Sequence, residues 1–107
     1  MPDQTPLTAA VDRLADRFRA MPQSRLQGPV PGHPSRAAAG LALARRLAAT
    51  GLALEGEPAR EIPDAGDFAV GDQLAVVGHD LAAAAMGNPE VLAAALADVE
   101  RVTELVT

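Results

Sequence analysis

The chain has 107 residues, a formal net charge of −5 and only two aromatic residues, Phe18 and Phe68. It contains no cysteine, which excludes disulfides, thiolate nucleophiles and cysteine-ligated zinc. The length suits a single domain, and an acidic chain without a basic face is a poor candidate for binding the phosphate backbone of a nucleic acid.

The composition also bears on the compartment. Every basic residue other than histidine is arginine, and the abundance of alanine and arginine without lysine is typical of a GC-rich bacterial genome. No basic region followed by an apolar run opens the sequence, so we expect no secretory signal. No segment approaches about 20 continuous apolar residues, so we expect no membrane span and a cytoplasmic location.

The first predicted helix covers residues 6–20. Thr5 is the expected cap, Pro6 suits the first helical position, and Pro22 ends the helix. A 4-3-4-3 spacing places five apolar side chains on one face, which are Leu7, Val11, Leu14, Phe18 and Met21.

A connector follows at residues 22–34. Its four prolines and two glycines forbid regular helix and disfavour an inner strand. His33 lies in this connector, and a loop histidine of this kind is either solvated or in contact with a ligand.

The second predicted helix covers residues 35–50, with Ser35 as its cap and Gly51 as the left-handed residue that closes it. Leucine and alanine cover nearly all of its surface, which is typical of a central helix. Residues 52–62 are interpreted mostly as loop, with a small hairpin as the alternative, because alanine and glutamate are weak strand formers.

The third predicted helix covers residues 72–86, between Asp72 as cap and Gly87 as terminator. The fourth covers residues 89–106 and begins with Asn88 as a cap before a first-position proline. The turn at Gly87 is so short that we expect these two helices to form a hairpin.

Four amphipathic helices predict an all-α fold for residues 1–107. The expected architecture is a small four-helix bundle-like domain, with helices packed about 20° from antiparallel. It carries a Pro/Gly-rich connector and, as a minor feature, the hairpin around residues 52–62.

The polar residues Asp72, His79 and Asp80 form the one constellation with a chemical interpretation. Asp72 and His79 are seven residues apart and so share a side of their helix, where a carboxylate could orient the imidazole as a base. The simpler interpretation is that Asp72 caps the helix and that the other two lie on its polar face.

A ridge of small residues runs beside these groups and has two interpretations. It either packs against the helix at 35–50 or the helix at 89–106, or it forms the seam of a dimer. The ridge consists of Gly71, Ala75, Gly78 and Ala82.

The functional prediction follows from what the sequence lacks and what it repeats. No phosphate loop, HExxH motif or Gly-x-Ser-x-Gly motif occurs, so we predict no metal, no cofactor and no catalytic residue. Regular apolar stripes favour a non-enzymatic protein–protein interaction or regulatory module that is homodimeric or binds another protein. The alternative is a small-molecule binding or catalytic domain that uses Asp72, His79 and Asp80. A helix-turn-helix DNA binder is a third hypothesis, which the acidic charge disfavours.

Overall fold

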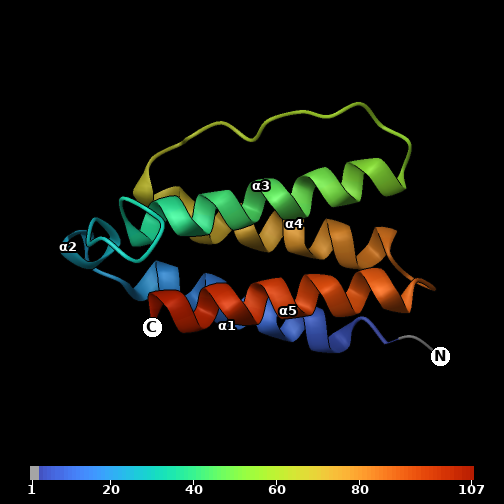
Figure 1. The fold of residues 1–107 in the computed structure, drawn as a ribbon, viewed down its shortest axis with the longest axis horizontal. Helices are drawn as coiled ribbons and strands as arrows, with labels where there is room; N and C mark the ends of the chain where they lie inside the picture. Colours follow the sequence, from blue (N-terminus) through green and yellow to red (C-terminus); the bar gives the residue numbers. More distant parts are fainter. Residues whose placement is uncertain (1–2) are drawn as a thin grey trace.

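The computed structural model describes residues 3–107 and has four long helices side by side along the long axis of the molecule (Figure 1). The long helices are α1 (Thr5–Ala20), α3 (Arg36–Leu54), α4 (Val70–Ala84) and α5 (Pro89–Val106), with the short α2 (Gln23–Leu26) and the 3₁₀ helix η1 (Asp67–Ala69) between them. Apart from an isolated bridge between Val30 and His33, residues 3–107 form no β-structure. The all-α prediction is confirmed.

Each long helix packs mainly against two others, so the four occupy the corners of a square. The packed pairs are α1 with α4, α1 with α5, α3 with α4 and α3 with α5. The chain runs in one direction along α1 and α5 and in the other along α3 and α4 (Figure 1). Two of the four packed pairs are therefore parallel.

The prediction that the helices on either side of Gly87 pack against each other as a hairpin is wrong. Helices α4 and α5 are antiparallel and joined by residues 85–88, but they lie across a diagonal of the square. The physical reason is that glycines bring other helices onto α4. Gly78 lies directly against Val11 of α1, and Gly51 of α3 lies against Leu81.

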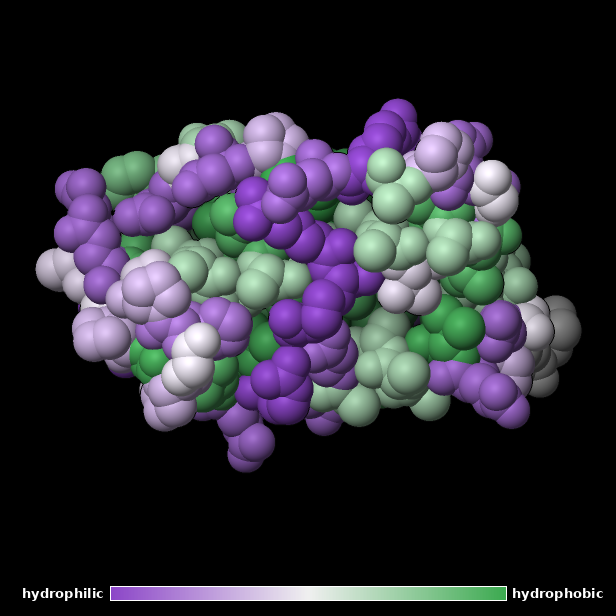
Figure 2. All heavy atoms as spheres, turned by 45° about the horizontal axis from the view of Figure 1, so that its top comes forward, coloured by the Kyte–Doolittle hydropathy of each residue, from purple (hydrophilic) through white to green (hydrophobic). Residues whose placement is uncertain are grey.

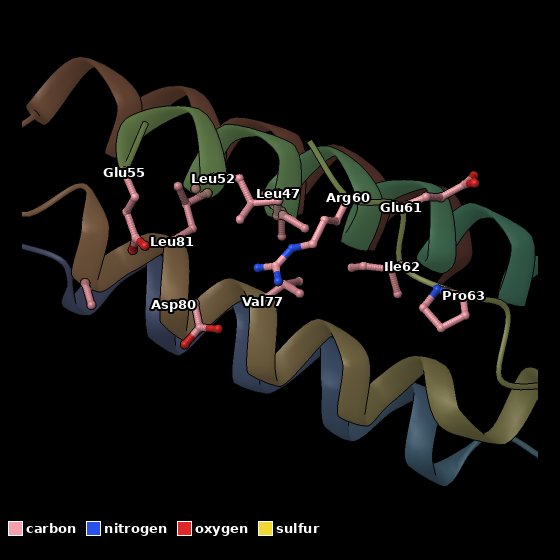
Figure 3. A pocket seen from close by; sticks show the side chains of 13 residues that line it. Leu47, Leu52, Glu55, Arg60, Glu61, Ile62, Pro63, Val77, Asp80 and Leu81 are labelled. Carbon is pink, nitrogen blue, oxygen red and sulfur yellow. The ribbon is translucent and has the colours of Figure 1, made fainter. Parts of the chain in front are cut away.

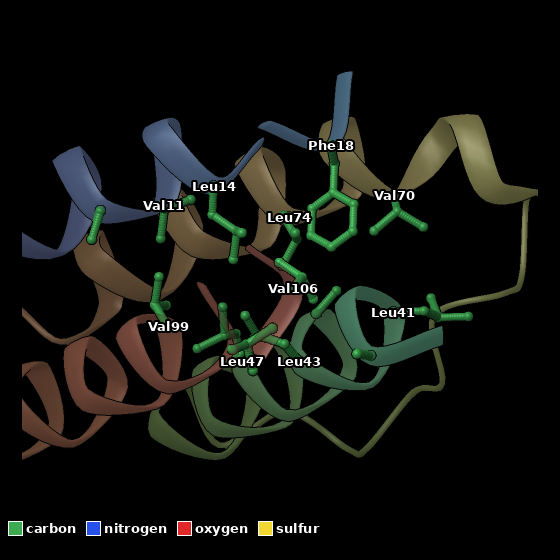
Figure 4. Packing of buried hydrophobic residues seen from close by; sticks show 14 of the residues in the cluster. Val11, Leu14, Phe18, Leu41, Leu43, Leu47, Val70, Leu74, Val99 and Val106 are labelled. Carbon is green, nitrogen blue, oxygen red and sulfur yellow. The ribbon is translucent and has the colours of Figure 1, made fainter. Parts of the chain in front are cut away.

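The core is built of leucine, valine and alanine, and no polar residue is buried in the part of the chain from residue 3 onward. Phe18 of α1 and Val70 of α4 meet over Gly40 of α3 (Figure 4). A Cβ atom at Gly40 would lie 2.6 Å from Val70 and 2.7 Å from the Phe18 ring. The 4-3-4-3 stripe predicted for the first helix is confirmed, because all five of its side chains are buried.

Two of the predicted caps are confirmed. The side chain of Ser35 accepts a hydrogen bond from the N–H of Ala38 at 3.0 Å, and Asn88 accepts one from Val91 at 3.2 Å. Each satisfies one of the backbone N–H groups that a helix start leaves unpaired.

Three predicted helix boundaries are wrong. Thr5 lies inside α1, and its own N–H donates to Asp3. Asp72 lies in the first turn of α4, which begins at Val70, and makes no cap hydrogen bond. Gly51 does not end its helix: α3 continues to Leu54, and Gly51 lies within the helix against Leu81 of α4. Glycine lacks a strong preference of its own, so it does not by itself mark the end of a helix.

The connector differs from expectation, whereas residues 55–62 form the loop that was predicted for most of residues 52–62. The connector contains the helical turn α2, which follows Pro22 and so loses no internal hydrogen bond to a proline. The hairpin around residues 52–62 does not form, since α3 takes up its first half. Residues 55–66, which we call the strap, cross back over α3 and α4 from one end of the bundle to the other (Figure 1).

Helix α3 is the one described helix long and apolar enough to cross a membrane by length and composition. Its side chains Leu43 and Leu47 are buried against the other helices, and Arg45 and Arg46 lie in its middle. This is the pattern of a helix that buries one face in a bundle. The central position predicted for residues 35–50 is wrong, because α3 packs mainly against α4 and α5 and leaves Arg46, Ala49 and Thr50 exposed.

Candidate functional site

The three polar candidates on α4 do not come together in one place. Asp72 and His79 are bound to side chains of α1, whereas Asp80 lines a pocket between α3 and α4. A single catalytic site built from all three has no location in this fold.

Asp72 forms an ion pair with Arg19 of α1. The Oδ1 atom of Asp72 accepts hydrogen bonds from Nε of Arg19 at 2.9 Å and from its terminal NH2 group at 2.8 Å, and Asp16 binds the same guanidinium at 3.0 Å. The hydrogen bonds from Arg19 to Asp72 and then to Asp16 raise the pKa of Arg19. Because the pair is largely exposed, it orients α1 and α4 more than it stabilises them.

His79 is bound to a carboxylate, but to that of Asp12 on α1 rather than to Asp72. Its Nε2 atom lies 2.7 Å from Oδ1 of Asp12, and both side chains are about half exposed. A carboxylate at this distance can hold an imidazole in one orientation. Neither His79 nor Asp12 lines the pocket between α3 and α4 or the hollows between α1 and α5.

The small-residue ridge is covered within the chain. Gly71, Gly78 and Ala82 are buried, and Ala75 is half-buried. A Cβ at Gly78 would lie 2.5 Å from Val11, and one at Gly71 would lie 2.8 Å from the Ala15 carbonyl oxygen. The covering helix is α1. The prediction that the ridge packs against the helix at 35–50 or the helix at 89–106 is therefore wrong. A second copy of the chain would have to displace α1 to reach this ridge.

A pocket of about 590 Å³ lies between α3, α4 and the strap, and we call it the strap pocket. Figure 3 shows Asp80 at its α4 side, Glu55 at the end of α3 and Arg60 extending from the strap toward Val77. The face of the molecule that carries the strap has hydrophilic side chains in a band between apolar areas (Figure 2). An apolar floor is contributed mainly by Leu47, Leu52, Ile62, Val77 and Leu81.

The strap is held at one end of the pocket. Arg45 donates from Nε to the Ile62 carbonyl at 2.9 Å and lies 3.6 Å from the Glu61 carboxylate. Gln73 donates to the Pro63 carbonyl, also at 2.9 Å. Through these bonds α3 and α4 each fix one carbonyl of the strap.

A shallow groove of about 700 Å³ separates the parallel helices α1 and α5. A second hollow of about 190 Å³ shares Ala93 and Leu96 with it, so the two form one groove, which we call the α1–α5 groove. Ala10, Ala97 and Leu96 are among its apolar lining residues. Its charged residues are Asp3 just before α1, Arg13 on α1, and Glu100, Arg101 and Glu104 on α5.

No cluster of three or more histidine and acidic side chains suited to a metal ion occurs within residues 3–107. His33 is half-buried in a tight turn, where it exchanges two backbone hydrogen bonds with Val30. The imidazole therefore sits on a local bridge of the connector, away from the strap pocket and the groove.

Comparisons with family models, with curated proteins and with solved structures find no significant match to this chain. The candidate sites therefore rest on their own geometry. Sequence reasoning missed Arg60, Asp12 and Arg19, because their partners are on other elements and no spacing along the chain signals such contacts.

Proposed function

We propose that this chain is a non-enzymatic helical interaction module that self-associates through the α1–α5 groove. The observation that carries the proposal is that this groove is lined by small apolar side chains, with Arg13 on its α1 side and Glu100 and Glu104 on its α5 side. The other cation of the α5 side, Arg101, is already paired with Asp98. In the same proposal the protein acts in the bacterial cytoplasm, on the grounds of its arginine-rich, lysine-free and cysteine-free composition.

The shape of the groove suits a helix. Helix α5 has 18 residues and is therefore about 27 Å long at 1.5 Å per residue. The exposed alanines Ala93 and Ala97 lie four residues apart along it, so a second helix can approach the backbone closely over successive turns. Half-buried Leu96 offers the larger apolar contact.

The charges favour a second copy of this chain as the occupant. Arg13 stands on the α1 side, and Glu100 and Glu104 stand on the α5 side. A two-fold axis that runs along the groove places each side of the groove against the opposite side of the partner, so that arginine meets glutamate twice. No ion pair joins α1 to α5 within the described chain, which leaves Arg13 and both glutamates available for such contacts.

A matched pair of variants tests the proposal. Ala93→Arg places a charge in the groove, whereas Ala94→Arg places the same charge on the next exposed residue of α5, outside the groove lining. Sedimentation velocity from micromolar to millimolar concentrations should give a dimer for the natural chain and for Ala94→Arg, and a monomer for Ala93→Arg.

A charge swap adds a second test. Arg13→Glu should weaken the dimer, and combining it with Glu100→Arg and Glu104→Arg should restore it. A natural chain that remains monomeric at millimolar concentration would rule out self-association through this groove, and would leave a helix of another protein as the occupant to seek.

A further inference from the structure

We infer that the strap pocket is a binding site for a small amphipathic amine, that is, a primary ammonium group on an apolar tail. This site lies between α3 and α4, separate from the α1–α5 groove, and does not depend on self-association.

The size and floor of the pocket suit an apolar tail. A volume of about 590 Å³ falls within the usual range of small-molecule sites. Leu47 and Leu81 at the base are buried, and Leu52, Val77 and Ile62 are half-buried around them. A tail placed here would bury apolar surface that the protein leaves partly open to water.

The carboxylates that line the strap pocket favour a ligand whose head group carries a positive charge. Asp80 and Glu55 both line the pocket, and within residues 3–107 neither has an ion-pair partner within 4.0 Å. Glu61, the third carboxylate of the lining, already has Arg45 at 3.6 Å. Two unpaired carboxylates beside an apolar floor match an ammonium ion that carries a tail.

Arg60 is the single cation of the lining. Its guanidinium extends into the pocket toward Val77 and Asp80 (Figure 3), and no hydrogen bond of the described chain holds it. Residues 58–60 of the strap likewise make no hydrogen bond to α3 or α4, in contrast with Ile62 and Pro63. Arg60 can therefore swing out of the pocket without breaking the bonds that fix the strap.

This arrangement makes Arg60 a competitor of the ligand. With the pocket empty, its guanidinium offsets part of the negative charge of Asp80 and Glu55. A ligand ammonium would take over that position and push Arg60 toward solvent. A carboxylate ligand would instead use Arg60 as its partner and meet two uncompensated acidic groups, which disfavours it.

The experiment uses n-octylamine and sodium octanoate as probes of opposite charge and matched tail. Titration into the ¹⁵N-labelled full chain, followed by amide chemical shifts, locates and measures binding. We expect octylamine to give saturable shifts in residues 47–55, 60–63 and 77–83, and octanoate to bind these residues more weakly.

Two variants should change the affinity for octylamine in opposite directions. Asp80→Asn removes a carboxylate and should weaken binding about threefold, and Arg60→Gln removes the competing cation and should strengthen it about threefold. All three positions Asp80, Arg60 and Glu57 are exposed, so folding is preserved, and Glu57→Gln is the matched control on the strap outside the pocket lining.

Several results would overturn the inference. Equal binding of octanoate, or an unchanged affinity for octylamine in Asp80→Asn, would show that the pocket binds the apolar tail without selecting the charge of the head group. Weaker octylamine binding in Arg60→Gln would mean that Arg60 helps the ligand rather than competing with it. An absence of saturable shifts in these residues would rule out the site.

Discussion

Helix α1 packs against two neighbours in two different ways, and the contrast explains where the molecule is closed and where it is open. Against α4 it meets Gly71 and Gly78, whose missing side chains let the backbones approach until a Cβ would overlap Val11 or the Ala15 carbonyl. Against α5 it leaves the shallow α1–α5 groove open, and the lining of this groove includes Ala10, Leu96 and Ala97. One ion pair, Arg19–Asp72, and the contact between His79 and Asp12 join α1 to α4, and no ion pair joins α1 to α5 within the described chain.

The difference shows that glycines on α4 allow the close approach of α1, whereas every residue that lines the α1–α5 groove carries a Cβ. Protein interiors are packed densely enough that a Cβ at the wrong place cannot be absorbed. Where the facing residues carry a Cβ, as along the α1–α5 groove, the groove surface stays open to another molecule. Substitutions that add or remove atoms between α1 and α4, or in the α1–α5 groove, test this difference.

The largest effect is expected for Gly78→Ala. The added Cβ would lie 2.5, 2.7 and 3.1 Å from the three side-chain atoms of Val11, a branched side chain that cannot turn aside. Overpacking outweighs the gain in helix propensity, and the free energy of unfolding should fall by about 1–2 kcal/mol. Urea denaturation followed by circular dichroism measures the change.

Gly51→Ala is the matched control for that prediction. Gly51 is also inside a helix, but a Cβ there would find its nearest neighbour, the Leu81 Cα, at an ordinary 3.7 Å. Only the gain in helix propensity remains, so stability should rise by up to about 1 kcal/mol. A stabilising effect of both substitutions would show that α1 is not held closely over Gly78.

Helices α3 and α5 are joined by hydrogen bonds to one carboxylate. Asp98 of α5 accepts hydrogen bonds from Arg46 of α3 at 2.9 and 3.0 Å and from Arg101 at 2.6 Å. Asp98→Asn should lower the free energy of unfolding at neutral pH by about 1 kcal/mol, since the amide cannot accept both guanidinium groups. Ala94→Asn, on an exposed residue of α5 outside the groove lining, is the control for introducing asparagine into this helix.

The same carboxylate predicts a pH dependence. Partial burial raises the pKa of Asp98, but the hydrogen bonds and charges of Arg46 and Arg101 outweigh burial and leave the pKa below its usual value. The stabilisation is therefore complete above the unfolded-state pKa of about 3.9, and it is lost as the pH falls from there through the folded-state pKa. The stability difference between the natural chain and Asp98→Asn should shrink between about pH 6 and about pH 3. A difference that stays constant would contradict this role.

Local signals in the sequence identified the helices but not all of their ends. Stripes of apolar residues and the caps Ser35 and Asn88 act through neighbours a few residues away, so the sequence alone predicts them. The helix-end roles predicted for Gly51 and Asp72 are wrong, because glycine and aspartate occur both at the ends of helices and inside them. Their contacts with Leu81 and Arg19 are distant in sequence and give no local signal.

The candidate sites depended even more on tertiary contacts. The sequence grouped Asp72, His79 and Asp80 because they share one helix, but the packing of α1 pairs the first two with its own side chains. Only Asp80 lies in a pocket, and its neighbour Arg60 belongs to a segment that carried no sequence signal beyond that of a loop. No pattern along the chain reveals which helix a loop will cross.

The smallest effect on the free energy of unfolding is expected in the open α1–α5 groove. Ala97→Leu adds three carbon atoms on the open side of α1, in the α1–α5 groove, whereas Gly78→Ala adds one on the closed side. Because the groove can accept the larger side chain, the free energy of unfolding should change by less than about 0.5 kcal/mol. Denaturation at a concentration low enough to keep the chain monomeric separates this effect from any change in self-association. A loss as large as that of Gly78→Ala would mean that α5 lies as close to α1 as α4 does, and the groove would then be no surface for a partner.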